Sequence, residues 1–340
     1  DFSRYIVGAY ATSPSLLSWE PEKETAFMKL LKGQLGKIRG LELPFFGDGI
    51  HPHDSELYLK LLDPEWEYVM TCLPGNMKAL EENKHFGLAS DNQPGRQQAI
   101  EYYKRASEAI KELNDYFGEN KVFAVAIATS PALMAKGVSS SQAALEKSLA
   151  TIARFDWSGA ELVIEHCDSG RLSITPVKGF ISIEEELAAI LAVKTKHSID
   201  IGMTINWARS VIEARNQNGA NQHILKAIKS GALRGLMFSG TSAVESIYGK
   251  WTDLHLPVAR EPGIDYFEET SLMTAENMKS CLVDSGWKEL SYLGVKVLAM
   301  TIIDATCERR VGVNFDTLKV LDREVKNLQS VVLSPADKFG

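Results

Sequence analysis

Short apolar runs alternate along the chain with longer stretches in which apolar residues recur at helical spacing. The short runs are rich in β-branched residues and predict eight β-strands, which fall within residues 4–11, 37–46, 67–75, 121–130, 161–169, 198–207, 234–242 and 295–304. Strands that alternate with helices are typical of repeated βα units, in which the strands form a parallel sheet.

The longer stretches predict helices within residues 21–35, 55–62, 95–117, 141–155, 182–196, 220–231, 274–286 and 315–331. Start and stop signals agree with several of these ranges. Ser182 precedes Glu184 and Glu185, as an N-cap precedes an acidic first turn. Gly231 and Gly286 stand where a helix is expected to end.

About eight such units over ~300 residues predict a closed (β/α)8 TIM barrel that forms a single domain over residues 1–340. An open doubly wound sheet is the alternative, but the first βα turn, "YATSPSLLS", lacks the GxGxxG fingerprint of dinucleotide-binding folds. Two connections, from Leu73 to the fourth strand and from Gly240 to Thr274, are longer than a barrel needs. We expect them to be extended loops over the C-terminal face of the barrel, where active sites form.

The alternation of side chains along a strand predicts which of them enter the barrel. Small or polar sets suit the crowded interior, whereas larger aliphatic sets suit the helix layer. We therefore expect the C-terminal ends of five strands to bring a set of side chains into one bowl, namely Glu42, Glu165, Asn206, Ser239 and Thr301.

Glu165 ends the run "ELVIE" and is the strongest catalytic candidate in the sequence, as a general base or as the anchor of a metal. Glu42 is its candidate partner, because two interior carboxyl groups with unequal burial have pKa values that are driven apart. A structural ion pair with a neighbouring Arg or Lys is the alternative for Glu165. His166 has the opposite parity and is expected to be a hydrogen-bonded residue of the helix layer.

The segment "INWARSVIEAR" contains a second group of candidates. Asn206 could hydrogen-bond a hydroxyl group, Trp207 could stack on a sugar ring, and Arg209 could hold an anion. The alternative is that Arg209 and Glu213 form an ion pair on a helix surface, since they are spaced i,i+4.

Several further candidates lie in loops. Asp253 and His255 in "WTDLHLP" could bind a metal, or the carboxylate could orient the imidazole as an acid partner. Asp168 could contact substrate or cap a loop. Ser239 is the first of the small residues in "FSGTS", which follows the seventh strand, where barrels often hold phosphate, although small residues also form plain turns. Cys72, at the end of the third predicted strand, is also expected at the rim of the barrel mouth.

Composition restricts the class of protein. The formal net charge is −7 and the basic residues are dispersed along the chain. We therefore do not expect the protein to bind nucleic acid. No segment is apolar enough to span a membrane, and no targeting signal is visible. The four cysteines lack CxxC spacing and are expected to be reduced thiols of a cytoplasmic protein.

The strings "TCLPGNM", "IEHCD", "INWARSVIEAR", "GLMFSG" and "WTDLHLP" give the chain a family resemblance. It resembles the xylose isomerase-like TIM-barrel superfamily, and within it the domain of unknown function family 4862. The resemblance implies a carboxylate and histidine site for a divalent metal (manganese, magnesium or zinc), with Glu165 at the position of the glutamate on the fifth strand. Where that pattern has carboxylate or histidine on later strands, this chain has Asn206, Ser239 and Met300 or Thr301, which are weak ligands. A complete cage would need Asp253, His255 or Asp304, so a protein without a cofactor is the equal alternative.

Together these features predict an isomerase or epimerase that transfers a proton on a carbohydrate or sugar phosphate, with a homo-oligomer as the candidate assembly. One alternative is an inactive carbohydrate-binding or regulatory barrel. A second alternative is glycoside cleavage by Glu42 and Glu165, which requires carboxyl groups about 5 to 9.5 Å apart across an open cleft.

Overall fold

Eight strands form a closed parallel barrel in which each strand pairs with the next and β8 pairs with β1. The computed structural model describes residues 2–15, 18–172 and 174–333. The strands are β1 Phe2–Val7, β2 Ile38–Pro44, β3 Glu67–Thr71, β4 Val122–Ile127, β5 Glu161–Glu165, β6 Gly202–Asn206, β7 Leu233–Phe238 and β8 Tyr292–Val295. The predicted (β/α)8 fold is confirmed.

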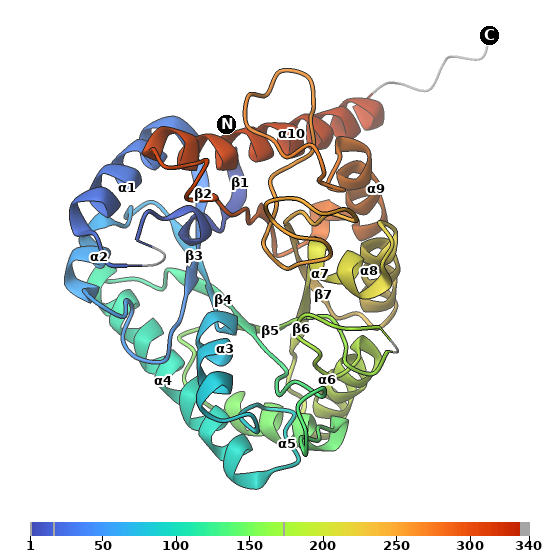
Figure 1. Cartoon of the computed structure of the whole chain (residues 1–340). Helices are drawn as coiled ribbons and strands as arrows, with labels where there is room; N and C mark the ends of the chain where they lie inside the picture. The colour runs from blue at the N-terminus through green and yellow to red at the C-terminus, as the bar shows by residue number, and fades with distance from the viewer. Residues whose placement is uncertain (1, 16–17, 173, 334–340) are drawn as a thin grey trace.

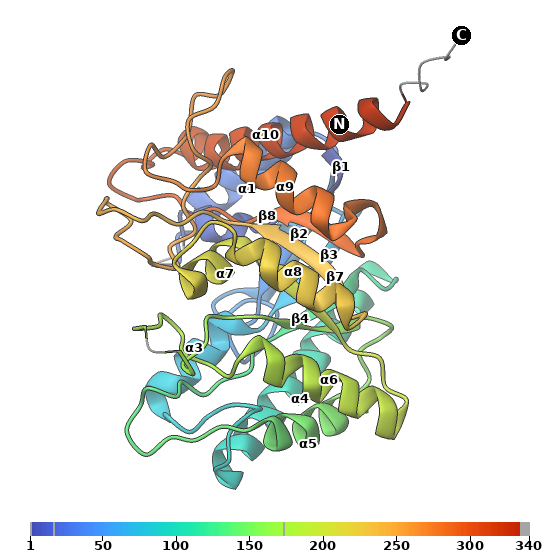
Figure 2. The same cartoon turned by 90° about the vertical axis from the view of Figure 1, so that its right-hand side faces the viewer.

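A ring of helices surrounds the barrel (Figure 1). The helices are α1 Pro21–Leu35, α2 Ser55–Leu61, α3 Leu73–Glu82, α4 Gln93–Phe117, α5 Gln142–Ile152, α6 Ile183–His197, α7 Trp207–Ala214, α8 Gly219–Lys229, α9 Ala275–Ser285 and α10 Cys307–Leu333, with 3-10 turns η1 Ala9–Thr12 and η2 Trp287–Glu289. The connection between β7 and α9 lies at the same end of the barrel as α3 and α7 (Figure 2). Among the described helices, none has both the length and the apolar character that crossing a bilayer requires.

Alternation along the strands separates two apolar cores, as expected for a barrel. The inner core is a small cluster made by Ile6, Val69, Ala124, Ala126, Val163, Met237 and Tyr292. The larger core lies between the strands and the helices. A strand residue two places beyond an inner-core residue faces the mouth, so Val163 of β5 places Glu165 there.

Two glycines make room for large interior side chains. A Cβ atom on Gly235 would lie 2.4 Å from the ring of Tyr292, which fills the barrel interior. A Cβ atom on Gly8 would lie 2.9 Å from Lys296. Gly8 therefore permits a lysine to enter the mouth between β1 and β8.

Several element boundaries differ from the prediction. Strand β1 ends at Val7, before the predicted end at residue 11, and helix α10 begins at Cys307, before the predicted start at residue 315. The eighth strand ends at Val295, so Thr301 lies in an exposed loop and the expectation that it enters the bowl is wrong. Helix α3 was expected to be loop, because its first turn contains Pro74 and Gly75, which usually indicate a turn. However, proline is tolerated in the first helical turn, where its missing N–H costs no hydrogen bond. The short helix α7 follows β6 without a connecting loop.

Candidate active site at the barrel mouth

The inward-facing positions at the C-terminal ends of the strands bring polar side chains together. They include Glu42 on β2, Thr71 on β3, Glu165 on β5 and Asn206 on β6, with Ser239 and Lys296 directly after β7 and β8. All six side chains are buried. The prediction that Glu42, Glu165, Asn206 and Ser239 share one opening agrees with this geometry.

Lys296 lies between the two glutamates. Its Nζ atom is 2.8 Å from Oε2 of Glu42 and 3.3 Å from Oε1 of Glu165. Burial alone would lower the pKa of Lys296, but Glu165 and Glu42 raise it well above its usual value. The lysine therefore stays protonated and supplies positive charge to both carboxyl groups.

Glu165 is held by three side chains. Besides Lys296, Arg209 on α7 brings its guanidinium to 2.6 Å from Oε1 of Glu165, and the Thr71 hydroxyl donates to Oε2 at 3.1 Å. Burial would raise the pKa of Glu165, but Arg209 and Lys296 overcome this effect and lower it to about 2. Glu165 is therefore an anion at every physiological pH.

Glu42 has the opposite tendency. Burial raises its pKa, and the nearby Glu165 raises it further, whereas Lys296 opposes both effects. Two carboxyl groups that share one lysine thus have pKa values displaced in opposite directions, which is the pattern found in acid–base pairs.

The β7–α9 loop adds a third carboxylate. Oδ2 of Asp253 lies 3.0 Å from Nε of Arg209 and 3.2 Å from Nζ of Lys178, which comes from the loop after β5. Nδ1 of His255 lies 3.4 Å from Oδ1 of Asp253. Burial lowers the pKa of His255 to about 3, so its imidazole is neutral near pH 7.

These contacts balance the charge of the mouth. We call Glu42, Glu165, Asp253, Lys178, Arg209 and Lys296 the mouth cluster, which contains three carboxylates and three cations. A divalent ion held by Glu42 and Glu165 would have to lie beside the ammonium group that now bridges them. A protonated lysine repels such an ion and offers it no lone pair, so the mouth cluster does not fit the metal cage that the resemblance implies.

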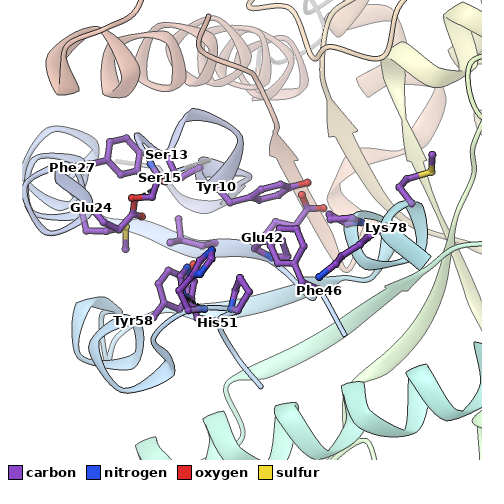
Figure 3. A pocket seen from close by; sticks show the side chains of 18 of the residues that line it. Tyr10, Ser13, Ser15, Glu24, Phe27, Glu42, Phe46, His51, Tyr58 and Lys78 are labelled. Atoms are coloured by element: carbon purple, nitrogen blue, oxygen red, sulfur yellow. Dashed lines mark hydrogen bonds between the residues drawn. The ribbon is translucent and has the colours of Figure 1, made fainter. Parts of the chain in front are cut away.

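A pocket of about 910 Å³ opens beside the mouth, over the C-terminal ends of β1 and β2 (Figure 3). Its inner end is formed by Glu42, Tyr10, Phe46 and Lys78, the last of which projects from α3. Glu42 is the member of the mouth cluster that lines this pocket. A ligand in the pocket would therefore meet Glu42, with Lys296 behind it.

The outer end of the pocket combines aromatic rings with small polar groups. Ser13, Glu24, His51, His53 and Tyr58 line it. The His51 ring stacks on Tyr58, with ring centroids 4.8 Å apart. The Ser13 hydroxyl donates to Glu24 at 2.5 Å.

Asn206 and Ser239 contact each other. The Ser239 hydroxyl donates to Oδ1 of Asn206 at 2.7 Å, while Nδ2 of Asn206 finds no partner among the described residues. The N–H of Gly240 donates to the carbonyl of Leu256, so "FSGTS" forms an antiparallel β-bridge with a later part of the β7–α9 loop. The role of Asn206 and Ser239 in binding substrate stays a prediction.

The structure contradicts one expectation and one alternative for the α7 segment. Trp207 is fully buried in the core between the strands and the helices, so it does not form a stacking wall. The surface ion pair between Arg209 and Glu213 is also absent from the described contacts, because Arg209 turns towards Glu165 and Asp253.

Asp168 serves the loop after β5. Its carboxylate accepts hydrogen bonds from the backbone N–H groups of Val177, at 2.5 Å, and Lys178, at 3.1 Å. This arrangement matches the loop-capping alternative and holds the Lys178 side chain where it reaches Asp253.

His166 lies in the helix layer, as its parity predicted. Nδ1 of His166 is 2.6 Å from Oε2 of Glu186, and Nε2 is 3.1 Å from Oε2 of Glu213. His223 approaches the other oxygen of Glu213 at 3.4 Å. Within the described part of the chain, His166, Glu213 and His223 are the group close enough to share a metal ion, with ligand atoms within 4.8 Å of one another. Their polar atoms already pair with each other, which is also the pattern of a structural hydrogen-bond network.

Sequence reasoning missed Lys296, Thr71 and Lys178. A signal for Lys296 was present, because it interrupts the apolar run "VKVL" between Val295 and Val297. A lysine that alternates with valines in a barrel strand has to point into the barrel or its mouth. Ser13, His51 and His53 of the pocket gave no such signal, because they lie outside the helices and strands, in segments without periodicity.

Comparisons with known proteins agree with the fold. The family model described as "Domain of unknown function (DUF4862)" matches residues 6–313. The chain is 33% identical over 324 residues to "Uncharacterized protein STM3670" of Salmonella typhimurium, covering 95% of this chain and 98% of the relative.

Solved structures of low sequence identity share the fold. A putative xylose isomerase from Rhodospirillum rubrum has a TM-score of 0.60 at 12% identity, covering 95% of this chain and 99% of that chain. A D-allulose 3-epimerase from Methylomonas sp. has a TM-score of 0.52 at 12% identity, covering 96% of this chain and 98% of that chain. The structural neighbours are thus xylose isomerase-like TIM barrels.

Proposed function

The chain belongs to the DUF4862 family, and from that premise we propose that it is a sugar isomerase or epimerase that moves a proton next to a carbonyl group. The observation that carries this proposal is the position of Glu42, a buried carboxyl group that lines the pocket and contacts Lys296. The names of structural neighbours, which include a putative xylose isomerase and a D-allulose 3-epimerase, support a sugar as the substrate.

Glu42 is the general base in this proposal. A base works best when its pKa approaches the working pH, and burial raises the pKa of Glu42. Glu165 would be a poor base, because its pKa is about 2. Glu165 therefore serves to hold Lys296 and Arg209, in place of the base or metal-anchor role that its strand position suggested. His255 is neutral and could act as the acid partner.

The reaction starts with the C–H bond beside the sugar carbonyl. Glu42 takes the proton, and the electron pair of that bond forms the C=C bond of an enediolate while the carbonyl oxygen becomes negative. Lys296 lies 2.8 Å from Glu42 and supplies positive charge near that oxygen. Glu42 returns the proton to the neighbouring carbon while the hydroxyl proton of that carbon moves to the enediolate oxygen, which gives the isomer. The epimer forms when a second acid, for which His255 is the candidate, delivers a proton to the opposite face of the first carbon and Glu42 keeps the proton it took.

The two alternative functions make different demands on the same residues. Glycoside cleavage needs open space between Glu42 and Glu165, and the ammonium group of Lys296 fills that space. A binding or regulatory protein would use the pocket without chemistry, so the absence of turnover together with sugar binding would favour it.

Deuterium exchange tests the proposal directly. The protein is incubated in D₂O with aldoses and ketoses, and NMR follows the loss of the proton beside the carbonyl group. We expect Glu42→Gln to lower the exchange rate by roughly 10²- to 10⁴-fold, the usual contribution of a general base. Glu67→Gln is the matched control, because Glu67 begins β3 at the opposite end of the barrel. Equal rates in both variants would remove Glu42 from the mechanism.

A further inference from the structure

The size and charge of the pocket restrict the substrate, if the proposed function holds. A volume of about 910 Å³ lies near the upper end of the ~300–1,000 Å³ range of pockets for drug-sized ligands. A free hexose is much smaller than such a ligand and would leave most of the pocket empty. The pocket is also elongated, because Glu42 and Lys78 mark one end while Glu24 and Ser13 mark the other (Figure 3).

The charges of the pocket disfavour a phosphate group. Three carboxyl groups, Glu24, Glu42 and Glu81, line it, and Lys78 is the one lysine or arginine among its described lining residues. Burial lowers the pKa of His51 to about 4, so that imidazole adds no positive charge near neutral pH. Sites for phosphate usually provide arginines, several lysines or a helix N-terminus, whereas a dianion here would meet mostly carboxylates.

The outer end offers surfaces that suit a sugar ring. The imidazoles of His51 and His53 lie 5.8 Å apart, centroid to centroid, and Trp19 packs on His51 at 4.5 Å. Ring faces of this kind bind the apolar face of a sugar, while Ser13, Ser15 and Glu24 can exchange hydrogen bonds with hydroxyl groups. Burial also raises the pKa of Glu24, so the carboxyl group is closer to neutral than a free glutamate.

We infer that the substrate is an unphosphorylated sugar carrying a second sugar ring or a ring of similar size. The carbonyl-bearing unit occupies the inner end at Glu42, and the second ring occupies the outer end beside His51 and His53. The placement of the carbonyl group at Glu42 rests on the proposed function. The presence of a second ring and the absence of a phosphate group on the substrate rest on the size and charge of the pocket.

Calorimetric titration of the full chain tests the inference with three kinds of probe: disaccharides with a free or ketose carbonyl (maltose, maltulose, lactulose), free hexoses, and hexose 6-phosphates. We expect at least one disaccharide to bind roughly tenfold or more tightly than its hexose units, since a second ring adds stacking and hydrogen bonds. The hexose phosphates should bind no tighter than the hexoses. Tighter binding of a phosphate, or equal binding of disaccharides and hexoses, would overturn the inference.

Two variants localise the effect. His53→Ala removes an exposed ring of the outer end and should weaken disaccharide binding roughly two- to tenfold, whereas His197→Ala, an exposed histidine at the end of α6, should not change it. Glu81→Lys replaces an exposed carboxylate by a cation and should improve binding of the hexose phosphates. Unchanged disaccharide affinity in His53→Ala would show that the second ring binds elsewhere.

The same probes separate failure of the inference from failure of the proposed function. If a disaccharide binds preferentially but undergoes no exchange in D₂O, the isomerase proposal fails and the ligand class stands. If a free hexose or its phosphate undergoes exchange that Glu42→Gln abolishes, while disaccharides do not bind, the reaction stands and the ligand class is wrong.

Discussion

Lys296 is the residue on which the mouth depends most, because it is completely buried and both of its partners are buried acids. We expect Lys296→Met, which keeps the volume and removes the charge, to lower the free energy of unfolding by about 3–5 kcal/mol, as for other broken buried ion pairs. Urea unfolding at pH 7 measures the loss. Exchange at the sugar carbonyl should fall as well, because the enediolate loses its cation.

Lys121→Met is the control for this prediction. Lys121 is also buried, but its carboxylate partner Glu119 is largely exposed and keeps its hydration when the lysine is lost. That substitution should cost about 1 kcal/mol, the upper end for an exposed ion pair. Equal losses in the two variants would mean that the charges of the mouth contribute nothing special to stability.

The same residues show what strand alternation can predict. Glu42 and Glu165 were placed correctly because a period of two leaves only two choices of face, and polarity decides between them. Lys296 was missed because the end of β8 was placed several residues too late. Thr301 was therefore expected at the mouth in its place. The partners of Arg209 were not predictable, since Asp253 reaches it from a loop whose path depends on tertiary contacts.

At the scale of elements, His166 joins β5 to the helices behind it. Its imidazole bridges Glu186 on α6 and Glu213 on α7, and Glu213 also meets His223 on α8. Burial would lower the pKa of His166, but Glu186 and Glu213 raise it to about 10 from a usual value of 6.5. The imidazolium form therefore connects three helices to the barrel.

This network predicts a specific pH dependence of stability. The folded protein keeps the proton of His166 up to about pH 10, whereas the unfolded chain loses it near 6.5. The stabilisation is therefore complete below pH 6.5 and decreases as the pH rises towards 10. In urea unfolding, wild type should lose stability between pH 7 and 10 more steeply than His166→Gln, which should be less stable at pH 6. Parallel curves for the two proteins would contradict the bridging role, and His197→Ala should follow wild type.

Most helices were predictable because an amphipathic pattern extends over many residues and has a start or stop signal. The range predicted for α1 coincides with the observed one. The failures, α3 and α7, are short helices that begin at a strand end, where the context of the barrel outweighs local propensity. Both contribute to the site, since Lys78 belongs to α3 and Arg209 to α7.

At the scale of the whole molecule, the barrel brings acids and bases from distant parts of the sequence to one end and balances their charges there. Metal-dependent barrels gather carboxylates that an ion must neutralise, whereas in this chain Lys178, Arg209 and Lys296 already neutralise Glu42, Glu165 and Asp253. The fold alone therefore does not carry the metal chemistry that the resemblance implies.

Chelation tests this conclusion. Because lysine and arginine occupy the places of the cation, treatment with EDTA followed by dialysis should change neither the unfolding midpoint nor the rate of sugar exchange, and added Mn²⁺, Mg²⁺ or Zn²⁺ should not raise either. Lys296→Ala should behave differently, since it leaves Glu42 and Glu165 facing an empty space in which Mn²⁺ can bind. An ion that binds only the folded state raises stability with its concentration, so Mn²⁺ should raise the midpoint of this variant and not that of wild type. Wild-type protein that loses stability or activity on chelation, and regains it with a stoichiometric ion, would place a metal centre in this barrel after all.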